Sequence, residues 1–125
     1  MTDTPRVHRG RRAHALGLAA EGAASAALER DGWNVRARRL RTEAGEVDLI
    51  AEQDGLLAII EVKARPTLAG AAFALTERQR RRLLAAAEIV LSAHPEWGAK
   101  GVRFDMLLVD AAGAVRRIAD AFRLE

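Results

Sequence analysis

The chain has 125 residues, which is enough for one domain with a real core and too few for two. Its 20 Lys and Arg outnumber its 17 Asp and Glu, and nearly all of the cations are Arg, a side chain that suits bidentate contacts with phosphate. It has no Cys, which excludes disulfides, thiol catalysis and metal sites built from Cys.

The first twelve residues form a basic N-terminal arm that includes Arg9, Arg11 and Arg12. No apolar segment of the signal-peptide type follows them, and no apolar run approaches the roughly 18 residues that a transmembrane helix needs. We therefore expect a cytoplasmic protein without a membrane segment. The arm is either a disordered, solvated tail or a phosphate-binding arm, and residues 13–125 are expected to form a single domain.

Residues 13–30 are rich in Ala and predict a first helix, which Gly32 closes. Glu21 lies on a face of this helix that also carries small side chains such as Ala24 and Ser25. Small side chains allow a helix to approach a sheet closely, so Glu21 can point inward to the strands. The alternative is an exposed glutamate on a solvated helix face.

A first strand is predicted around residues 33–37, where apolar and polar residues alternate. The arginines of this strand and of the segment after it are expected to face solvent, with contact to phosphate as the alternative. They are Arg36, Arg38, Arg39 and Arg41.

The stretch from residue 45 to residue 63 predicts a β-hairpin, in which two apolar-rich runs meet at Asp54-Gly55. Asp-Gly favours a type I′ turn, because both central residues of that turn need a positive φ. With these two residues as the loop, the register places Asp48 opposite Glu61 on one face of the hairpin. The side chains expected on the other, core-facing side are Val47, Leu49, Ile60 and Val62.

The polar face of this hairpin has an unusual charge arrangement. Two carboxylates directly opposite each other repel, so such a pair is typical of a site that binds a cation. Asp48 and Glu61 are therefore candidate ligands for a hard divalent ion, Mg²⁺ or Mn²⁺. Lys63 stands one pleat away, where its side chain can orient a water as an ammonium or deprotonate a water as a neutral amine. Glu46 is expected to be its cross-strand ion-pair partner. The alternative is an ordinary solvated strand edge.

A second helix is predicted up to residue 93, before Pro95, and Thr76 and Gln79 match a capping box at its start. Arg78 and Arg81 on this helix are candidate nucleic-acid contacts. The side chains expected to face inward are Leu83, Leu84, Ala87, Val90 and Leu91.

Residues 102–109 predict a strand inside a sheet, because the second half of this segment is apolar on both faces. Arg103 and Asp105 share a face of the strand, and we prefer a structural ion pair to a catalytic role for them. A last short strand is predicted near residues 115–118.

Asp48 followed by Glu61-Val62-Lys63 resembles the signature of the PD-(D/E)xK nuclease superfamily, with Val47-Asp48 in place of Pro-Asp. More closely, GEVDLIA followed by IIEVKAR resembles the YraN-like family, small bacterial proteins with an endonuclease-like fold and no settled function. The resemblance extends from about Arg9 to Phe122.

This resemblance implies roles for individual residues. Asp48, Glu61 and the carbonyl of Val62 would hold the metal, and Glu21 would join them directly or through water. Lys63 would position or activate the attacking water. Related nucleases often carry a Gln or Lys on the helix after this strand, so an active-site role and a capping role both stay open for Gln79.

The predicted order of helix, three strands, helix and two strands gives an α/β domain with a mixed β-sheet flanked by helices. The same αβββαββ order is that of the restriction-endonuclease-like core that the resemblance implies. We therefore expect a metal-dependent nuclease that acts on DNA, with branched or recombination DNA as a candidate substrate and a homodimer as a candidate assembly. A catalytically silent module that binds nucleic acid or protein on the same scaffold is the alternative.

Overall fold

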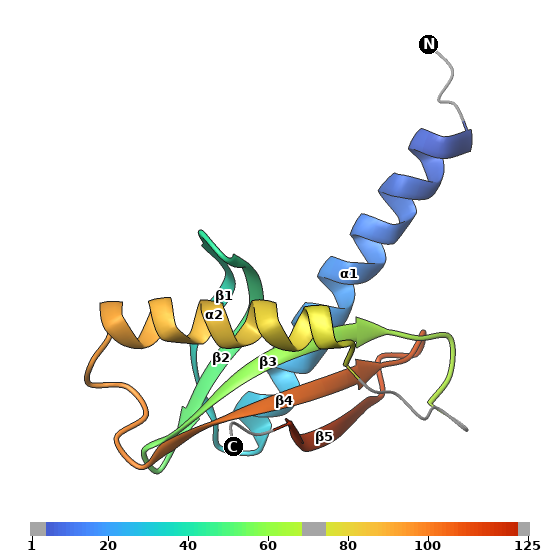
Figure 1. The fold of residues 1–125 in the computed structure, drawn as a ribbon. Coiled ribbons are helices and arrows are strands. Elements are labelled where there is room, and N and C mark those ends of the chain that lie inside the picture. The colour runs from blue at the N-terminus through green and yellow to red at the C-terminus, as the bar shows by residue number, and fades with distance from the viewer. Residues whose placement is uncertain (1–4, 69–74, 123–125) are drawn as a thin grey trace.

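The structure is a computed structural model that describes residues 5–68 and 75–122, with the side chains of residues 17–68 and 75–118. These described residues form two helices and five strands, which follow one another in the predicted order (Figure 1). They are α1 (Pro5–Arg30), β1 (Asn34–Thr42), β2 (Gly45–Gln53), β3 (Leu56–Ala64), α2 (Glu77–Ala93), β4 (Gly101–Val109) and β5 (Val115–Phe122).

The five strands form one mixed sheet in the order β1-β2-β3-β4-β5. Only β3 and β4 run parallel to each other, and the connection between them contains α2. The other neighbouring pairs are antiparallel. The mixed α/β class expected from the sequence is therefore confirmed.

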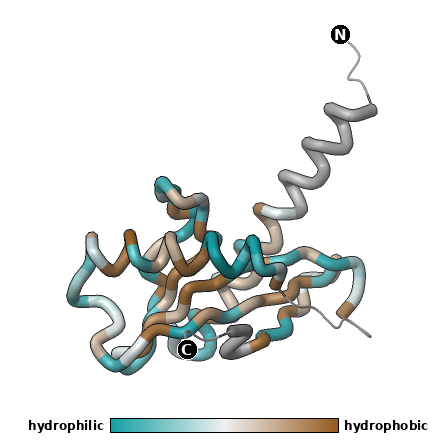
Figure 2. The backbone as a smooth tube through the Cα atoms, viewed as in Figure 1, coloured by the Kyte–Doolittle hydropathy of each residue, from teal (hydrophilic) through white to brown (hydrophobic). Residues whose placement is uncertain are grey.

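The two helices cover opposite faces of the sheet and create two separate cores. On one face, Ala20, Ala24 and Leu28 of α1 pack with Leu49 and Ile60 of the sheet. On the other face, α2 packs on a second cluster of apolar side chains that come from several strands, and hydrophobic residues recur along the strands that α2 covers (Figure 2). Residues 57–60 of β3 are all buried, as expected for a strand covered on both faces.

The inward residues of α2 agree broadly with the prediction. Leu83, Ala87 and Val90 are buried, and Leu84 and Leu91 pack against the same cluster while partly exposed. In the described residues neither helix is long and apolar enough to cross a membrane.

The predicted hairpin is present, and its register is as predicted up to Leu49 and Ile60, whereas the ladder does not continue to the predicted pair of Asp48 and Glu61. The paired residues of β2 and β3 run from Gln53–Leu56 to Leu49–Ile60, and the turn residues Asp54 and Gly55 have φ angles of 52° and 83°. Both positive angles are what a type I′ turn requires. The Asp-Gly signal therefore determined the alignment of the two strands.

The alternation of side chains in β2 breaks near Asp48, which was not predicted. Leu49 and Ile60 pack under α1, but Val47 packs in the cluster under α2, so the expectation that Val47 and Leu49 share a face was wrong. At this point the Asp48 side chain accepts a hydrogen bond from the backbone N–H of Val62 at 2.8 Å. The N–H of Val62 therefore bonds to a side chain of β2 and not to a backbone carbonyl of that strand. The two strands depart there from a regular ladder.

The first helix begins at Pro5, earlier than the predicted start at residue 13. The backbone of Arg9, Arg11 and Arg12 therefore belongs to α1 rather than to a separate arm, and their side chains lie outside the described ones. At the other end Gly32 has a φ of 86°, and the next residue, Trp33, donates its N–H to the carbonyl of Leu28, as in a Schellman motif.

Candidate functional site

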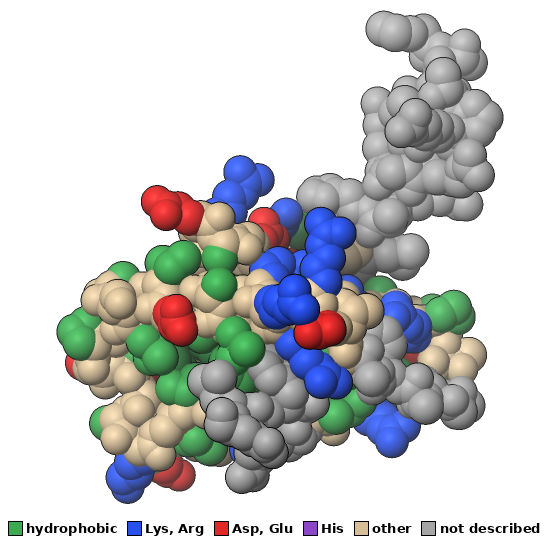
Figure 3. All heavy atoms as spheres, viewed as in Figure 1, with side chains coloured by type: hydrophobic (Ala, Val, Ile, Leu, Met, Phe, Trp, Pro, Cys, Tyr) green, Lys and Arg blue, Asp and Glu red, His purple; other side chains and the backbone are tan. Residues whose placement is uncertain are grey.

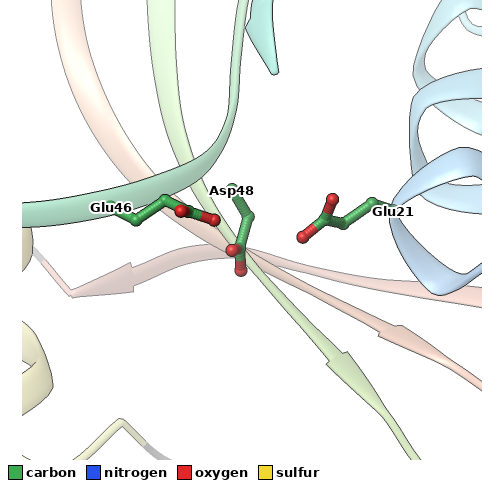
Figure 4. Close-up of side chains that lie close together, drawn as sticks. All are labelled: Glu21, Glu46 and Asp48. Atoms are coloured by element: carbon green, nitrogen blue, oxygen red, sulfur yellow. The ribbon is translucent and has the colours of Figure 1, made fainter. Parts of the chain in front are cut away.

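Three carboxylates converge where α1 passes the start of β2. Glu46 and Asp48 come from β2 and Glu21 comes from α1, and their side chains point toward one another (Figure 4). One oxygen from each of the three lies within 4.8 Å of the others, and all three residues are partly buried. The prediction that Glu21 points inward to the strands is thus confirmed, and Glu46 joins it unexpectedly.

Asp48 is harder to ionise than an ordinary aspartate. Its pKa is raised to about 6 from an ordinary 3.8, chiefly by burial and also by the nearby charges of Glu61 and Glu21. The Val62 amide and the Lys63 ammonium act in the opposite direction and lower this pKa. A cation placed among these acids would relieve the same repulsion.

Glu61 is buried, with 5% of its surface exposed, and its carboxylate is held by two cations. Nη2 of Arg82, on α2, lies 3.1 and 3.0 Å from the two carboxylate oxygens of Glu61. Nζ of Lys63 lies 3.2 Å from Oε1 of Glu61. The expected cross-strand pair between Glu46 and Lys63 is therefore wrong, because the lysine pairs with the acid on its own strand.

Glu46 instead pairs with arginines of β1. Nε of Arg39 lies 3.6 Å from Glu46 Oε1 and also 3.6 Å from Glu21 Oε2, and Nε of Arg41 lies 3.7 Å from Glu46 Oε2. Arg39 was expected to face solvent with its neighbours. It has a φ of 49°, a left-handed backbone that is uncommon for a residue with a side chain, and it lies beside the acidic cluster.

Gln79 occupies the capping box at the start of α2. Its backbone N–H donates to Oγ1 of Thr76 at 3.1 Å, and its side-chain Oε1 accepts the Thr76 N–H at 2.9 Å. The capping role is therefore observed, while the active-site role stays a prediction.

Gln79→Ala is expected to lower the free energy of unfolding by about 1 kcal/mol, because one reciprocal bond of the box is lost. Gln79→Glu keeps an acceptor at the same place and is expected to melt close to the parent. Thermal unfolding of both variants checks this. A Gln79→Ala protein that melts with the parent would show that the box contributes nothing measurable.

The candidate DNA contacts of α2 lie on its exposed surface. Basic side chains gather over the N-terminal turns of this helix (Figure 3). Arg78 is exposed, and Arg81 is exposed as well and pairs with Glu77 at 2.6 Å. Arg82, on the same helix, was not predicted to be a site residue. Its position three residues after Gln79 and next to the buried Leu83 is the signal that could have identified it.

The Arg103–Asp105 ion pair expected from the sequence is present, with 3.0 Å between Nη2 and Oδ2. Asp105 is completely buried and also binds Arg117 at 2.8 Å. Both guanidinium groups lie over the ring of Trp33, at 5.0 and 4.6 Å from its centre. Strand alternation does not reveal that Arg117 binds Asp105 or that both arginines contact Trp33.

The sequence was compared with known proteins. Residues 20–109 match the uncharacterised protein family UPF0102. A UPF0102 protein of Granulibacter bethesdensis is 62% identical over 120 residues, which cover 96% of this chain and 76% of that protein. A UPF0102 protein of Azorhizobium caulinodans is 50% identical over 123 residues, with 98% and 94% covered, and one of Rhodopseudomonas palustris is 47% identical over 106 residues, with 85% and 82% covered.

Proposed function

Since the chain belongs to the uncharacterised protein family UPF0102, whose description names no activity, we propose a function from the geometry of the site. The protein is a metal-dependent nuclease that hydrolyses phosphodiester bonds in DNA. Family membership confirms the resemblance to YraN-like proteins. The nuclease superfamily and its restriction-endonuclease-like fold are part of the proposal.

The observation that carries the proposal is the convergence of three acids beside a lysine. Glu21, Glu46 and Asp48 offer one oxygen each within 4.8 Å, and oxygen donors in this number suit Mg²⁺ or Mn²⁺. The raised pKa of Asp48 supports the same proposal, because an ionised carboxylate at this position is unfavourable unless a positive charge neutralises it. The donor set is therefore suited to a hard divalent cation.

Asp48 and Glu21 would hold the metal, together with the carbonyl of Val62 and with Glu61 once its carboxylate leaves Arg82. Glu46 would be the third carboxylate of the cluster around the metal, and Glu21, Glu46 and Asp48 form the acidic wall of the site. A bound Mg²⁺ or Mn²⁺ would polarise the phosphoryl oxygen and stabilise the charge that develops on it. Arg39 at 3.6 Å from Glu21 and Glu46 partly neutralises this wall and would have to adjust when a cation binds.

Lys63 would serve the attacking water. Its ammonium lies beside Glu61 on β3, and its side chain is 26% exposed, so a water can reach it from solvent. A positioned ammonium can orient that water or bind developing negative charge. Because Lys63 is part of β3, its ammonium has a fixed position. A fixed group close to the attacking water lowers the entropic cost of hydrolysis.

A hollow of about 330 Å³ opens next to the end of β3 and leaves room for part of a substrate. Its lining is mostly small and apolar and includes Ala20 of α1 and Ala64 and Arg65, which follow Lys63 directly. We propose that DNA approaches the lysine from this end of the strand.

A second candidate function is a silent module that binds nucleic acid or protein. The observation that favours it is that Glu21, Glu46 and Glu61 are each already paired with a cation of the chain. Glu61 pairs with Arg82 and Lys63, and Arg39 lies between Glu21 and Glu46. In that case the acids would be a structural ion-pair network without turnover.

A cleavage assay separates these two functions. The purified protein is incubated with linear, flapped and four-way DNA in Mg²⁺, in Mn²⁺ and in EDTA. Metal-dependent products that are absent with Asp48→Asn support the nuclease. Asp54→Asn is the matched control, since it makes the same exchange in the exposed turn of the same hairpin. DNA binding without products from any substrate would favour the silent module.

DNA affinity is expected to fall steeply with salt, because arginine contacts with phosphate release counterions. Replacing Arg9, Arg11 and Arg12 together with Gln should reduce the slope of log affinity against log salt by about one unit for each arginine that contacts phosphate. Fluorescence anisotropy with a labelled duplex at several salt concentrations measures this slope. An unchanged slope would assign these residues to solvent.

A further inference from the structure

Arg82 connects α2 to the candidate site through a single contact. Its Nη2 bridges both oxygens of Glu61, at 3.1 and 3.0 Å. The Glu61 side chain is 6% exposed, whereas the Arg82 side chain is 36% exposed. The carboxylate of this ion pair is therefore buried, while the arginine side chain is partly open to solvent.

The stem of Arg82 is held in place by the turn between β1 and β2. A Cβ added at Gly45 would lie 2.8 and 2.9 Å from Cδ and Cγ of Arg82, closer than such atoms can approach. Gly45 has a φ of 130°, so both its conformation and its missing side chain are needed there. The guanidinium is thus positioned by α2 and by the turn before β2.

The guanidinium is only partly used in this position. Its Nε is buried and has no hydrogen-bond partner among the described residues. An arginine carries five N–H donors in a fork that matches carboxylate and phosphate oxygens. A buried donor without an acceptor is unfavourable, and an incoming oxygen ligand would satisfy it.

We propose that Arg82 binds a phosphate of the DNA and that its ion pair with Glu61 is exchanged when DNA and metal bind. This inference rests on the proposed nuclease function and assigns a substrate-binding role to Arg82, which so far has been only the ion-pair partner of Glu61. In the free protein Arg82 holds the Glu61 carboxylate. With DNA present the guanidinium turns to the phosphate, and Glu61 becomes available to the cation beside Asp48.

The exchange keeps every charge neutralised. Arg82 exchanges a carboxylate for a phosphate, and Glu61 exchanges a guanidinium for a divalent cation. Neither Arg82 nor Glu61 is then left buried and unpaired. A consequence is reciprocal linkage, in which DNA tightens metal binding by the same factor as metal tightens DNA binding. The ion pair therefore keeps the site incomplete until the substrate arrives.

The test measures binding and not turnover. Affinity for Mn²⁺ is determined by calorimetry with and without a short duplex, and duplex affinity is determined by anisotropy with and without Mn²⁺. Both measurements use a duplex with phosphorothioate linkages that resist hydrolysis. For the parent we expect DNA to tighten Mn²⁺ binding roughly 5-fold or more, within the usual range of coupling between sites. For Arg82→Gln we expect Mn²⁺ to bind without DNA at least as tightly as in the parent, and DNA to change that affinity less than about 2-fold.

Arg80→Gln is the matched control, because Arg80 is an exposed arginine on the same turns of α2. Among the described residues, the ion pairs of Glu61 are with Arg82 and Lys63 and not with Arg80. Arg80→Gln should keep the coupling of the parent. Arg82→Lys keeps a positive charge for Glu61 but lacks the fork, so it should fold like the parent and show a smaller coupling. Thermal melts establish whether each variant is folded. If Arg82→Gln is not folded, the coupling measured for Arg82→Lys tests the inference.

Two results would overturn the inference and leave the nuclease proposal standing. One is a parent that binds DNA and Mn²⁺ independently of each other, and the other is an Arg82 variant that couples them as the parent does. A parent that binds neither Mn²⁺ nor DNA would instead remove the proposed function and this inference with it. Coupling in the parent and in Arg80→Gln, lost or reduced when Arg82 is replaced, supports the exchange.

Discussion

Lys63→Ala is expected to abolish DNA cleavage, with a loss of about 10²- to 10⁴-fold in rate, while the protein stays folded. The rate falls because no other group on β3 would place a positive charge beside the attacking water. The fold survives because Glu61 keeps its second cation, Arg82, at 3.0 Å. DNA binding in EDTA should change little, since one ammonium contributes only a small part of the total phosphate contact.

The measurement is a single-turnover cleavage rate in Mg²⁺, together with a thermal melt and an anisotropy titration. Lys100→Ala is the matched control, because Lys100 is the other lysine of the chain and lies exposed before β4. It should cleave like the parent. A Lys63→Ala protein that cleaves at the rate of the parent would end the catalytic assignment, and one that unfolds would make the lysine structural.

Asp48→Asn is expected to remove cleavage and, at the same time, to make the metal-free protein more stable at pH 8. The folded protein raises the pKa of Asp48 to about 6, against 3.8 for an ordinary aspartate. At pH 8 the carboxyl is ionised in the folded and unfolded states, so the folded state carries an unfavourable charge that asparagine lacks. Asparagine keeps an oxygen that can accept the Val62 N–H.

The sign of the pH dependence follows from the raised pKa. As the pH falls through about 6, folded Asp48 takes up a proton that the unfolded chain still lacks, and the parent gains stability relative to the variant. The advantage of Asp48→Asn should be on the order of 1 kcal/mol at pH 8, after allowance for partial solvent exposure, and should disappear near pH 4. Denaturant unfolding of both proteins between pH 4 and pH 8 measures the difference.

The metal response provides the second readout of Asp48→Asn. At about 100 times its dissociation constant, Mg²⁺ or Mn²⁺ should stabilise the parent by about 2.7 kcal/mol, because the ion binds only the folded state. The variant should barely respond, and Asp54→Asn should respond like the parent. A parent whose melting temperature ignores both ions would refute the metal site, and with it the nuclease.

Local signals in the sequence were enough to predict the architecture. Asp54-Gly55 with period-2 runs on either side determines the register of β2 and β3, because turn type and strand alternation are properties of neighbouring residues. The same holds for the Thr76–Gln79 box and for the end of α1 at Gly32. Order of elements, sheet class and the inward face of α2 follow from such short-range patterns.

The register also located the candidate site, since it places Asp48 near Glu61 and Lys63. It did not predict how the charges pair. Periodicity assigned Glu46 to Lys63, but the lysine binds Glu61 and Glu46 binds arginines of β1. Val47 is on the opposite face from the one that alternation gives.

The pairing of charges was decided only by the tertiary structure. Several arginines lie on α2 and on β1, and the sequence does not say which of them reaches a given carboxylate. Arg82 reaches Glu61 because α2 packs across the sheet above β3 and the missing side chain of Gly45 leaves room for its stem. Arg39 reaches Glu21 because α1 lies beside β1 and because the backbone of Arg39 itself is left-handed. Backbone periodicity acts between neighbours in sequence, whereas these ion pairs join elements that only packing brings together.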